Sequence, residues 1–456
     1  MAGVSEALGE AVRGRIIELG DPDYDEARSV YNGMIDKKPA AVVQVADVAD
    51  VIASVNHARE NGLDLAIRGG GHSAPGFGTV DNGLVIDFAK RTGVHVDARN
   101  KTARAEAGCT WADFNHATHA YGLATPGGIV GSTGIAGLTL GGGIGYLARK
   151  HGLSCDNLIS ADVVTAAGKL VTASAKENED LFWALRGGGG NFGVVTSLEY
   201  QLHPVDIVHT GIIIYSLEHA AAVGAFYREN IASAPEEFGA FLGFHLGPPV
   251  PFLPEEWHGK PVVVVVGMWT GDPAEGEKRW QPYLDAAPVA GSMVAPLPYP
   301  FLNGAFDPLL PKGMQAYWKA AFMNELSDES IATHATHAAK IPSIPTAVHL
   351  YPIDGAVQRV GADETAFGYR DVNFSPVIAC MWDDPAENTA NVQWVRDYYA
   401  AVQPFSAPGG YINFMDADDQ ARIGENYAGN YAKLQSVKKT WDPGNLFHVN
   451  QNVTPG

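Results

Sequence analysis

The sequence contains little cysteine. Its 456 residues include 3 cysteines, Cys109, Cys155 and Cys380, which stand far apart and form no CxxC pair. A disulfide framework, a zinc knuckle and a thiol redox motif are therefore not expected. His334 and His337 lack a neighbouring carboxylate or cysteine, so we expect helical surface there and no metal site anywhere in the chain.

The sequence also contains few basic residues. Lys and Arg number 31 against 51 Asp and Glu, which gives a net charge of −20 and a pI near 5.1. A chain of this charge repels phosphate backbones, so nucleic acid is not an expected partner. Charged residues make up 18% and apolar residues 46%, a composition typical of globular proteins.

Long apolar runs are missing. The run at 261–269 is far shorter than the about 18–20 residues of a membrane helix and indicates a buried strand. Residues 1–27 show no apolar core followed by a cleavage site. We therefore expect a soluble, cytoplasmic protein with no membrane partner.

Glycine, in contrast, is abundant. The chain has 52 glycines, and between residues 69 and 193 they gather in clusters at 69–71, 127–128, 131–145 and 187–193. Consecutive glycines let backbone N–H groups converge on an anion without obstruction by side chains. Four such clusters in succession predict a long polyanionic cofactor lying along the backbone.

The elements around these clusters alternate between helix and strand. Strands are predicted at 42–45, 63–67 and 84–88, and a hairpin around Asn100 is predicted at 94–107. Asp47 should cap a helix that Gly62 ends, and Thr110 to Asp113 resembles a capping box.

One cluster matches the dinucleotide fingerprint GxGxxG, at 188–193. The preceding residues 180–186 indicate a helix, and the following residues 194–200 indicate a strand. The fingerprint requires the opposite order, so a nicotinamide-binding Rossmann domain is excluded. No GxxxxGK[ST] motif occurs, which also excludes P-loop kinases and ATPases.

Four segments together resemble a known family. RGGGHS at 68–73, the glycine-rich 125–158, EDLFWALRGGGGNFGVV at 179–195 and the C-terminal 430–452 resemble the berberine-bridge-enzyme-like FAD oxidases of the vanillyl-alcohol-oxidase superfamily. The resemblance implies an α+β fold with a bipartite, PCMH-type FAD-binding domain. It places that domain at 1–204 (its PCMH-type part at about 37–206) and 411–456.

The resemblance also implies a substrate domain at 205–410 built on an antiparallel sheet. The apolar runs at 211–215, 239–246, 261–269, 345–353 and 374–382 independently predict strands in this region. The proline-rich segment 290–313 indicates an ordered loop instead of a helix.

The resemblance implies that His72 is bonded covalently to FAD. A neutral imidazole nitrogen can add to an electrophilic form of the flavin, and the bond makes the flavin a stronger oxidant. Many relatives add a second bond from cysteine, but Val130 stands at that position here. We therefore expect FAD attached through His72 only.

Further cofactor contacts are implied along the same motifs. The resemblance places Thr133 where the family controls oxygen access by side-chain size, and threonine matches neither of the hydrophobic residues usual there. The choice between an oxidase and a dehydrogenase therefore stays open. The remaining expected contacts are Arg68, Gly69, Gly70, Gly71, Ser73, Gly128, Ser132, Gly134, Gly137, Gly142, Val195 and Asn450.

The catalytic base is the point at which this chain departs from the family. The base tyrosine of the alcohol-oxidising relatives, the second in a YxNY segment, is Phe414 here. Tyr411 and Asn413 remain and would share one face of a strand, as would His349 and Tyr351. Lys319 is a further candidate catalytic group, the alternative being that it extends to solvent beside a core Trp318.

The resemblance implies an FAD-dependent oxidase. A substrate C–H of an alcohol or amine would give a hydride to His72-linked FAD, and O2 would reoxidise the flavin to yield H2O2. A dehydrogenase with another acceptor and a flavin-holding protein without turnover are the alternatives. The expected partners are a small organic substrate and O2. The absent base tyrosine and the aromatic residues of the substrate domain favour an aromatic or amine-bearing substrate over a sugar.

Overall fold

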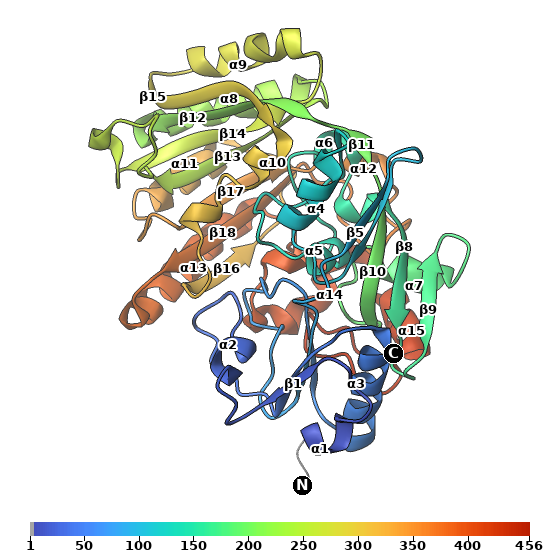
Figure 1. Cartoon of the computed structure of the whole chain (residues 1–456). Coiled ribbons are helices and arrows are strands. Elements are labelled where there is room, and N and C mark those ends of the chain that lie inside the picture. The colour runs from blue at the N-terminus through green and yellow to red at the C-terminus, as the bar shows by residue number, and fades with distance from the viewer. Residues whose placement is uncertain (1–3) are drawn as a thin grey trace.

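The computed structural model describes residues 4–456 and has an α+β architecture (Figure 1). Two sheets form within the first two hundred residues. The first has the order β1 (Arg15–Glu18), β2 (Ala41–Gln44), β4 (Leu84–Asp87), β3 (Leu65–Arg68), and only β1 runs antiparallel to its neighbour. The second, antiparallel throughout, has the order β5 (Val94–Asp97), β6 (Thr102–Glu106), β10 (Val194–Gln201), β8 (Leu158–Val164), β9 (Leu170–Ser174). The two-residue strands β7 (Leu123–Ala124) and β11 (His203–Pro204) pair with each other.

The local signals of this region are confirmed. Helix α3 (Val48–Asn61) begins where the Asp47 side chain accepts the Asp50 N–H, and it ends at Gly62, whose φ of 62° is left-handed. Helix α4 (Trp111–His119) begins with the predicted capping box at Thr110. The helix–strand order around 180–200 is also confirmed, by α7 (Glu179–Leu185) and β10.

The middle of the chain forms one seven-stranded antiparallel sheet. Its order is β15 (Val289–Pro298), β12 (Ile207–Ser216), β14 (Pro261–Trp269), β13 (Phe238–Leu246), β17 (Ala347–Pro352), β18 (Phe374–Trp382), β16 (Gln315–Ala320). All five predicted strands are present. Helices α8 (Ala220–Ser233), α11 (Asp328–Ala338) and α13 (Asn388–Val402) cover one face, and the other face turns toward the N-terminal part (Figure 1).

Two predictions for this region are wrong. Segment 290–313 is not a loop: most of it is edge strand β15 followed by the short helix α10 (Tyr299–Asn303). An edge strand tolerates proline because its outer N–H groups need no partner strand. His334 does lie on a helix, α11, but it is fully buried and its Nδ1 lies 2.8 Å from the Tyr398 hydroxyl.

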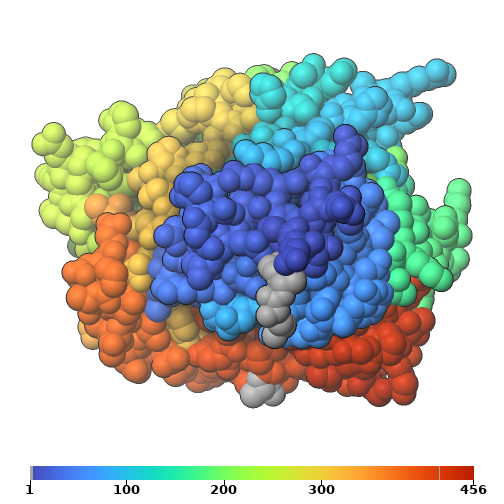
Figure 2. Space-filling view, turned by 60° about the horizontal axis from the view of Figure 1, so that its bottom comes forward, coloured from blue at the N-terminus to red at the C-terminus, as the bar shows by residue number. Residues whose placement is uncertain are grey.

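The last segment of the chain returns to the first part. Helix α15 (Tyr431–Trp441) packs on α7, and its apolar side chains belong to the same core as those of the N-terminal sheets. The buried Lys438 Nζ donates to the carbonyl of Asn191 at 2.7 Å and to that of Phe447 at 2.9 Å. Figure 2 shows this C-terminal segment, in red, beside the blue N-terminal residues. The cofactor-side domain is therefore built from both ends of the chain.

The remaining helices are short, and one of them, α9 (Gly276–Asp285), packs on strands β12 and β15 of the large sheet. These helices are α1 (Val4–Leu8), α2 (Tyr24–Arg28), α5 (Ile135–Leu140), α6 (Ala148–His151), α9, α12 (Ala356–Arg359) and α14 (Ile423–Asn426).

Candidate active site

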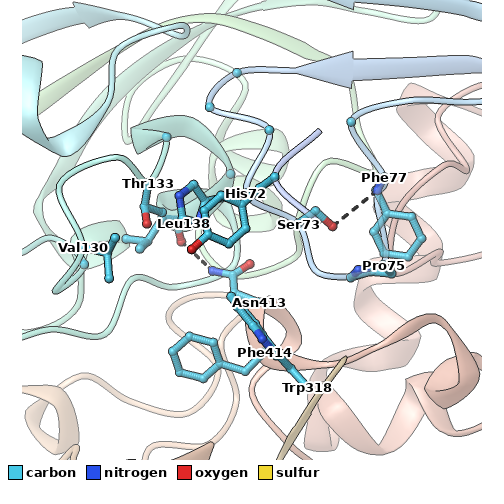
Figure 3. A pocket seen from close by; sticks show the side chains of 18 of the residues that line it. His72, Ser73, Pro75, Phe77, Val130, Thr133, Leu138, Trp318, Asn413 and Phe414 are labelled. Atoms are coloured by element: carbon cyan, nitrogen blue, oxygen red, sulfur yellow. Dashed lines mark hydrogen bonds between the residues drawn. The ribbon is translucent and has the colours of Figure 1, made fainter. Parts of the chain in front are cut away.

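A cavity lies between the glycine-rich loops and the open face of the seven-stranded sheet. One wall comes from the loops after β3, before α5 and before β10, and the other from β13, β16, β17 and β18. The C-terminal segment around Asn413 and Phe414 closes it from a third side (Figure 3). The cavity therefore lies at the junction between the sheet and the loops, which come from distant parts of the sequence.

The glycine-rich wall is suited to a polyanion. Within the described part of the chain, the backbone N–H groups of Gly70, Gly71 and His72 donate no hydrogen bond to protein. A Cβ on Gly70 would lie 2.5 Å from the Gly134 nitrogen, so only glycine lets these two loops meet. A Cβ on Gly137 would meet no atom within 4 Å, which leaves its backbone open to the cavity. Free N–H groups on an open glycine surface are what an extended pyrophosphate requires.

His72 projects into this cavity from the first glycine loop (Figure 3). Its Nε2 lies 2.9 Å from the Ser132 hydroxyl, and its ring stacks on Tyr31 with centroids 3.8 Å apart. Burial lowers the pKa of His72 to about 4, so the imidazole is neutral at neutral pH. The contact to Ser132 fixes one ring nitrogen, and no hydrogen bond engages the other within the described residues.

Most of the other expected cofactor residues line the same cavity. Ser73 accepts the Phe77 N–H at 3.4 Å, and Arg68 is held in a buried ion pair with Asp87 at 3.0 Å. The expected residues on the lining are Arg68, Gly69, Gly70, Gly71, His72, Ser73, Gly128, Thr133, Gly134, Gly137, Val195 and Asn450.

Two expected cofactor residues lie off the lining. Ser132 reaches it only through its contact to His72. Gly142 is turned away, because a Cβ there would meet the rings of Phe367 at 2.9 Å and Tyr411 at 3.3 Å.

Asn450 adds a polar atom with no protein partner. Its Nδ2 donates to the carbonyls of Phe447 at 3.0 Å and Gly190 at 3.2 Å, while its buried Oδ1 accepts no hydrogen bond. A buried unsatisfied acceptor on a cavity wall is costly unless a ligand supplies the donor. The residues present therefore fit a flavin nucleotide.

No cysteine lies on the described lining of the cavity. Val130 occupies the position expected from the motif and lines it (Figure 3). Cys109, Cys155 and Cys380 are all fully buried elsewhere, and burial raises the pKa of each thiol.

The segment around Phe414 differs from its expected form. Residues 412–414 form a 3-10 turn instead of a strand. Tyr411 does not reach the cavity: its buried hydroxyl accepts the Gly143 N–H at 2.8 Å and the Asn413 Nδ2 at 2.7 Å. Asn413 does line the cavity and also donates to the Leu138 carbonyl at 2.9 Å (Figure 3). The structure thus makes Tyr411 a support for Asn413.

Lys319 and Trp318 differ from the expected core tryptophan and solvent-facing lysine: Trp318 is on the cavity wall and Lys319 is buried. Trp318 lines the cavity and lies with Phe414 on the side opposite His72 (Figure 3). Lys319 points the other way, and its buried Nζ lies 2.5 Å from Asp418 and 2.7 Å from Asp419. Burial opposes the charge, but these hydrogen bonds outweigh it and hold the pKa of Lys319 above its usual value. Lys319 is therefore neither a cavity residue nor a solvent-exposed one.

The sheet wall brings His349 and Tyr351 together and adds a residue that sequence reasoning missed. His349 Nδ1 lies 2.7 Å from the Tyr351 hydroxyl, and His349 Nε2 lies 2.8 Å from Nε2 of His245 on β13. All three line the cavity. Tyr31, beside His72, was missed as well. The alternation of Phe241, Gly243 and His245 along β13 was the available signal for His245.

Comparison with known proteins decides the family. The family model described as FAD binding domain matches residues 39–174, and the model "Berberine and berberine like" matches residues 410–454. The FAD-linked oxidoreductase YgaK of Bacillus subtilis is 31% identical over 97% of each chain. The chain belongs to the berberine-bridge-like FAD-linked oxidoreductases.

Two further relatives of this FAD-linked oxidoreductase are informative. The (R)-6-hydroxynicotine oxidase of Paenarthrobacter nicotinovorans is 36% identical over 98% of this chain and 97% of its own. The solved structure of BBE-like 1 from Physcomitrella patens superposes with a TM-score of 0.87 at 25% identity and covers 99% of both chains. The relatives named as FAD-linked oxidoreductase or oxidase match nearly the whole of this chain, which is therefore an FAD-linked oxidoreductase too.

Among residues 4–456, no group of three or more His, Cys, Asp or Glu is placed to hold a metal ion. No helix in the same range is long and apolar enough to cross a bilayer.

Proposed function

We propose that this oxidoreductase oxidises a C–H bond of a small organic alcohol or amine with FAD that is bonded covalently to His72 alone. The observation that carries the proposal is the neutral His72 imidazole on the cavity wall, with one nitrogen beside Ser132 and the other without a partner. Bound FAD would supply the hydride acceptor, and O2 would reoxidise it to give H2O2.

The surroundings of His72 favour bond formation. Only a neutral imidazole has a lone pair for attack, and burial keeps His72 neutral. The Ser132 hydroxyl and the Tyr31 ring hold the imidazole in one orientation, which removes the entropy cost of aligning it. Val130 in place of cysteine supports a single bond.

The sheet wall supports an uncharged substrate. On β13, β16, β17 and β18 the described lining is apolar or aromatic apart from His245, His349 and Tyr351, and it includes no carboxylate, lysine or arginine. Oxidation of an alcohol or amine also needs a base for the OH or NH proton. His349 and Tyr351 are the candidates that face the cavity.

The first experiment is an absorption spectrum before and after acid precipitation, on wild type and His72→Ala. Flavin colour that stays in the wild-type pellet and leaves that of the variant supports a single bond through His72. Release from wild type would overturn the covalent link, and a colourless protein would overturn flavin binding. Colour retained in the His72→Ala pellet would show a second attachment.

The electron acceptor is tested separately. Thr133 lines the cavity where the resemblance places the control of oxygen access, and its hydroxyl makes that position more polar than the usual hydrophobic choices. We expect substrate-reduced enzyme to be reoxidised by air with one H2O2 per turnover. Reoxidation by an artificial quinone but not by air would establish a dehydrogenase instead.

A further inference from the structure

Three polar side chains on the sheet wall form one continuous hydrogen-bond chain. It runs from the Tyr351 hydroxyl to His349 Nδ1 over 2.7 Å, and from His349 Nε2 to His245 Nε2 over 2.8 Å. A neutral imidazole accepts at one ring nitrogen and donates at the other. His349, engaged at both nitrogens, can therefore take a proton on one side and release one on the other.

The register of the sheet creates this chain. Gly243 of β13 pairs with His349 of β17, and His245 lies two residues further on the same face. A Cβ on Gly243 would lie 3.1 Å from His349 Cδ2 and 3.4 Å from His245 Nε2. The missing side chain at Gly243 thus leaves the space in which the two rings approach each other.

The hydrogen-bond chain has an inner end at Tyr351 and an outer end at His245. Tyr351 is buried, and its ring lies 5.9 Å from that of Phe414, the residue that replaces the family's base tyrosine. A second aromatic ring, one that carries a hydroxyl, therefore lies next to the side chain at which this sequence has phenylalanine. His245, at the other end, is half-buried and faces the ring of Phe306.

We propose that Tyr351, His349 and His245 form a proton relay that carries the substrate proton from the inner end of the cavity to His245. The proposal rests on the function proposed above. Tyr351 is the catalytic residue of this proposal, because it lines the cavity in which the substrate would bind. His349 and His245 act through Tyr351 as positioning residues that also hold the proton.

The transfer conserves protons and electrons. The substrate OH or NH proton passes to the Tyr351 oxygen, the Tyr351 proton moves to His349 Nδ1, and the proton on His349 Nε2 moves to His245 Nε2. His245 ends as an imidazolium with one added proton. The second hydrogen of the substrate leaves with its electron pair to the acceptor named above, so the substrate is oxidised by two electrons.

The surroundings fix the protonation state in which the relay starts, with both histidines neutral. Burial lowers the pKa of His245 to about 4, and burial together with His245 lowers the pKa of His349. Burial, with Tyr411 nearby, raises the pKa of Tyr351, which therefore starts as a phenol. The ring neighbours Phe241 and Phe306 are apolar, and within the described chain no carboxylate, lysine or arginine bonds to any of the three.

The first test needs no substrate. In the full-length protein as purified, with 15N-labelled histidine at neutral pH, the relay requires His349 Nδ1 to show the chemical shift of an unprotonated nitrogen and Nε2 that of a protonated one. Tyr351→Phe should shift the Nδ1 signal, and His245→Gln should shift Nε2. A protonated Nδ1 in wild type would overturn the direction proposed here.

The second test separates proton transfer from structure. In His245→Gln, the glutamine oxygen can still accept from His349 but cannot take up a proton. We expect flavin reduction by benzyl or cinnamyl alcohol, measured without O2, to slow by about 10²-fold or more, with melting temperature and flavin content unchanged. His245→Ala should recover activity with added imidazoles, faster for the more basic ones.

Other outcomes separate the two proposals. Unchanged reduction in His245→Gln, or no rescue of His245→Ala by any imidazole, would overturn the relay and leave the oxidoreductase proposal intact. A wild-type protein that holds no flavin would overturn the proposed function, while the histidine chemical shifts would still report on the relay.

Discussion

Replacement of Lys319 by methionine should destabilise the protein strongly without touching the cavity. Lys319 lies on β16, and its two carboxylate partners lie in the 3-10 helix Ala417–Arg422 of the C-terminal segment. Asp418 has substitutes for the lost partner: the Tyr317 hydroxyl at 2.6 Å and Arg396 at 3.0 Å. Asp419, whose side chain is 6% exposed, would be left as a buried, unpaired carboxylate.

The expected loss of stability follows from the difference between Asp418, which keeps two partners, and Asp419, which loses its partner. Removal of one partner from a buried ion pair costs about 3–5 kcal/mol. Because Asp418 is partly solvated and keeps two partners, we expect the lower end, about 3 kcal/mol in the free energy of unfolding. Neutralising the stranded carboxylate in Lys319→Met/Asp419→Asn should recover much of the loss.

Urea unfolding followed by tryptophan fluorescence measures both values, with Lys319→Arg as the charge-preserving control. A loss below about 1 kcal/mol in Lys319→Met, the range of an exposed pair, would refute the buried-pair reasoning. A double variant no more stable than the single one would refute the role given to Asp419.

Three other outcomes follow from the geometry. Ser132→Ala should keep FAD but slow its covalent attachment to His72, measured as the fraction of acid-stable flavin over time after adding FAD to apoprotein; equal rates would argue against Ser132 as the orienting group. In a His72→Ala background, where the proposed covalent bond cannot form, Gly70→Ala should lower FAD affinity about tenfold in equilibrium titration, because its Cβ would collide with the loop of Gly134. Gly137→Ala, whose Cβ would meet no atom within 4 Å, is the matched variant that should preserve the fold. Burial lowers the pKa of His334 to about 3, so the unfolded chain binds a proton there below pH 6.5 that the folded one does not. Stability should fall as pH drops from 6.5 toward 3, by about 1.4 kcal/mol per pH unit from this residue, and His334→Phe should flatten that slope; an unchanged slope would show that His334 does not contribute.

The glycine-rich loops that line the cavity could be predicted from sequence because their signals are local. Gly69 to Gly71 and His72 are consecutive in the chain, and a run of glycines indicates directly that the backbone there must be free of side chains. The caps at Asp47 and Thr110 were predictable for the same reason, since each bonds to a residue three positions away.

The substrate side was less predictable because it depends on pairing between distant strands. His245 meets His349 across 104 positions through the register of β13 and β17, which no local pattern gives. Lys319 seemed a free polar group until the fold brought Asp418 and Asp419 to it. Tyr411 lies off the cavity because residues 412–414 turn instead of extending, and its hydroxyl accepts the Gly143 N–H.

The position of α15 has a consequence for biosynthesis. Lys438 donates to the carbonyl of Asn191, so a contact that holds the fourth glycine cluster in place comes from a residue made about 250 positions later. While the chain grows from its N-terminus, the glycine loops exist long before the helix that braces them. The complete cofactor wall therefore forms only after α15 has emerged from the ribosome, and we expect stable binding of FAD late in synthesis.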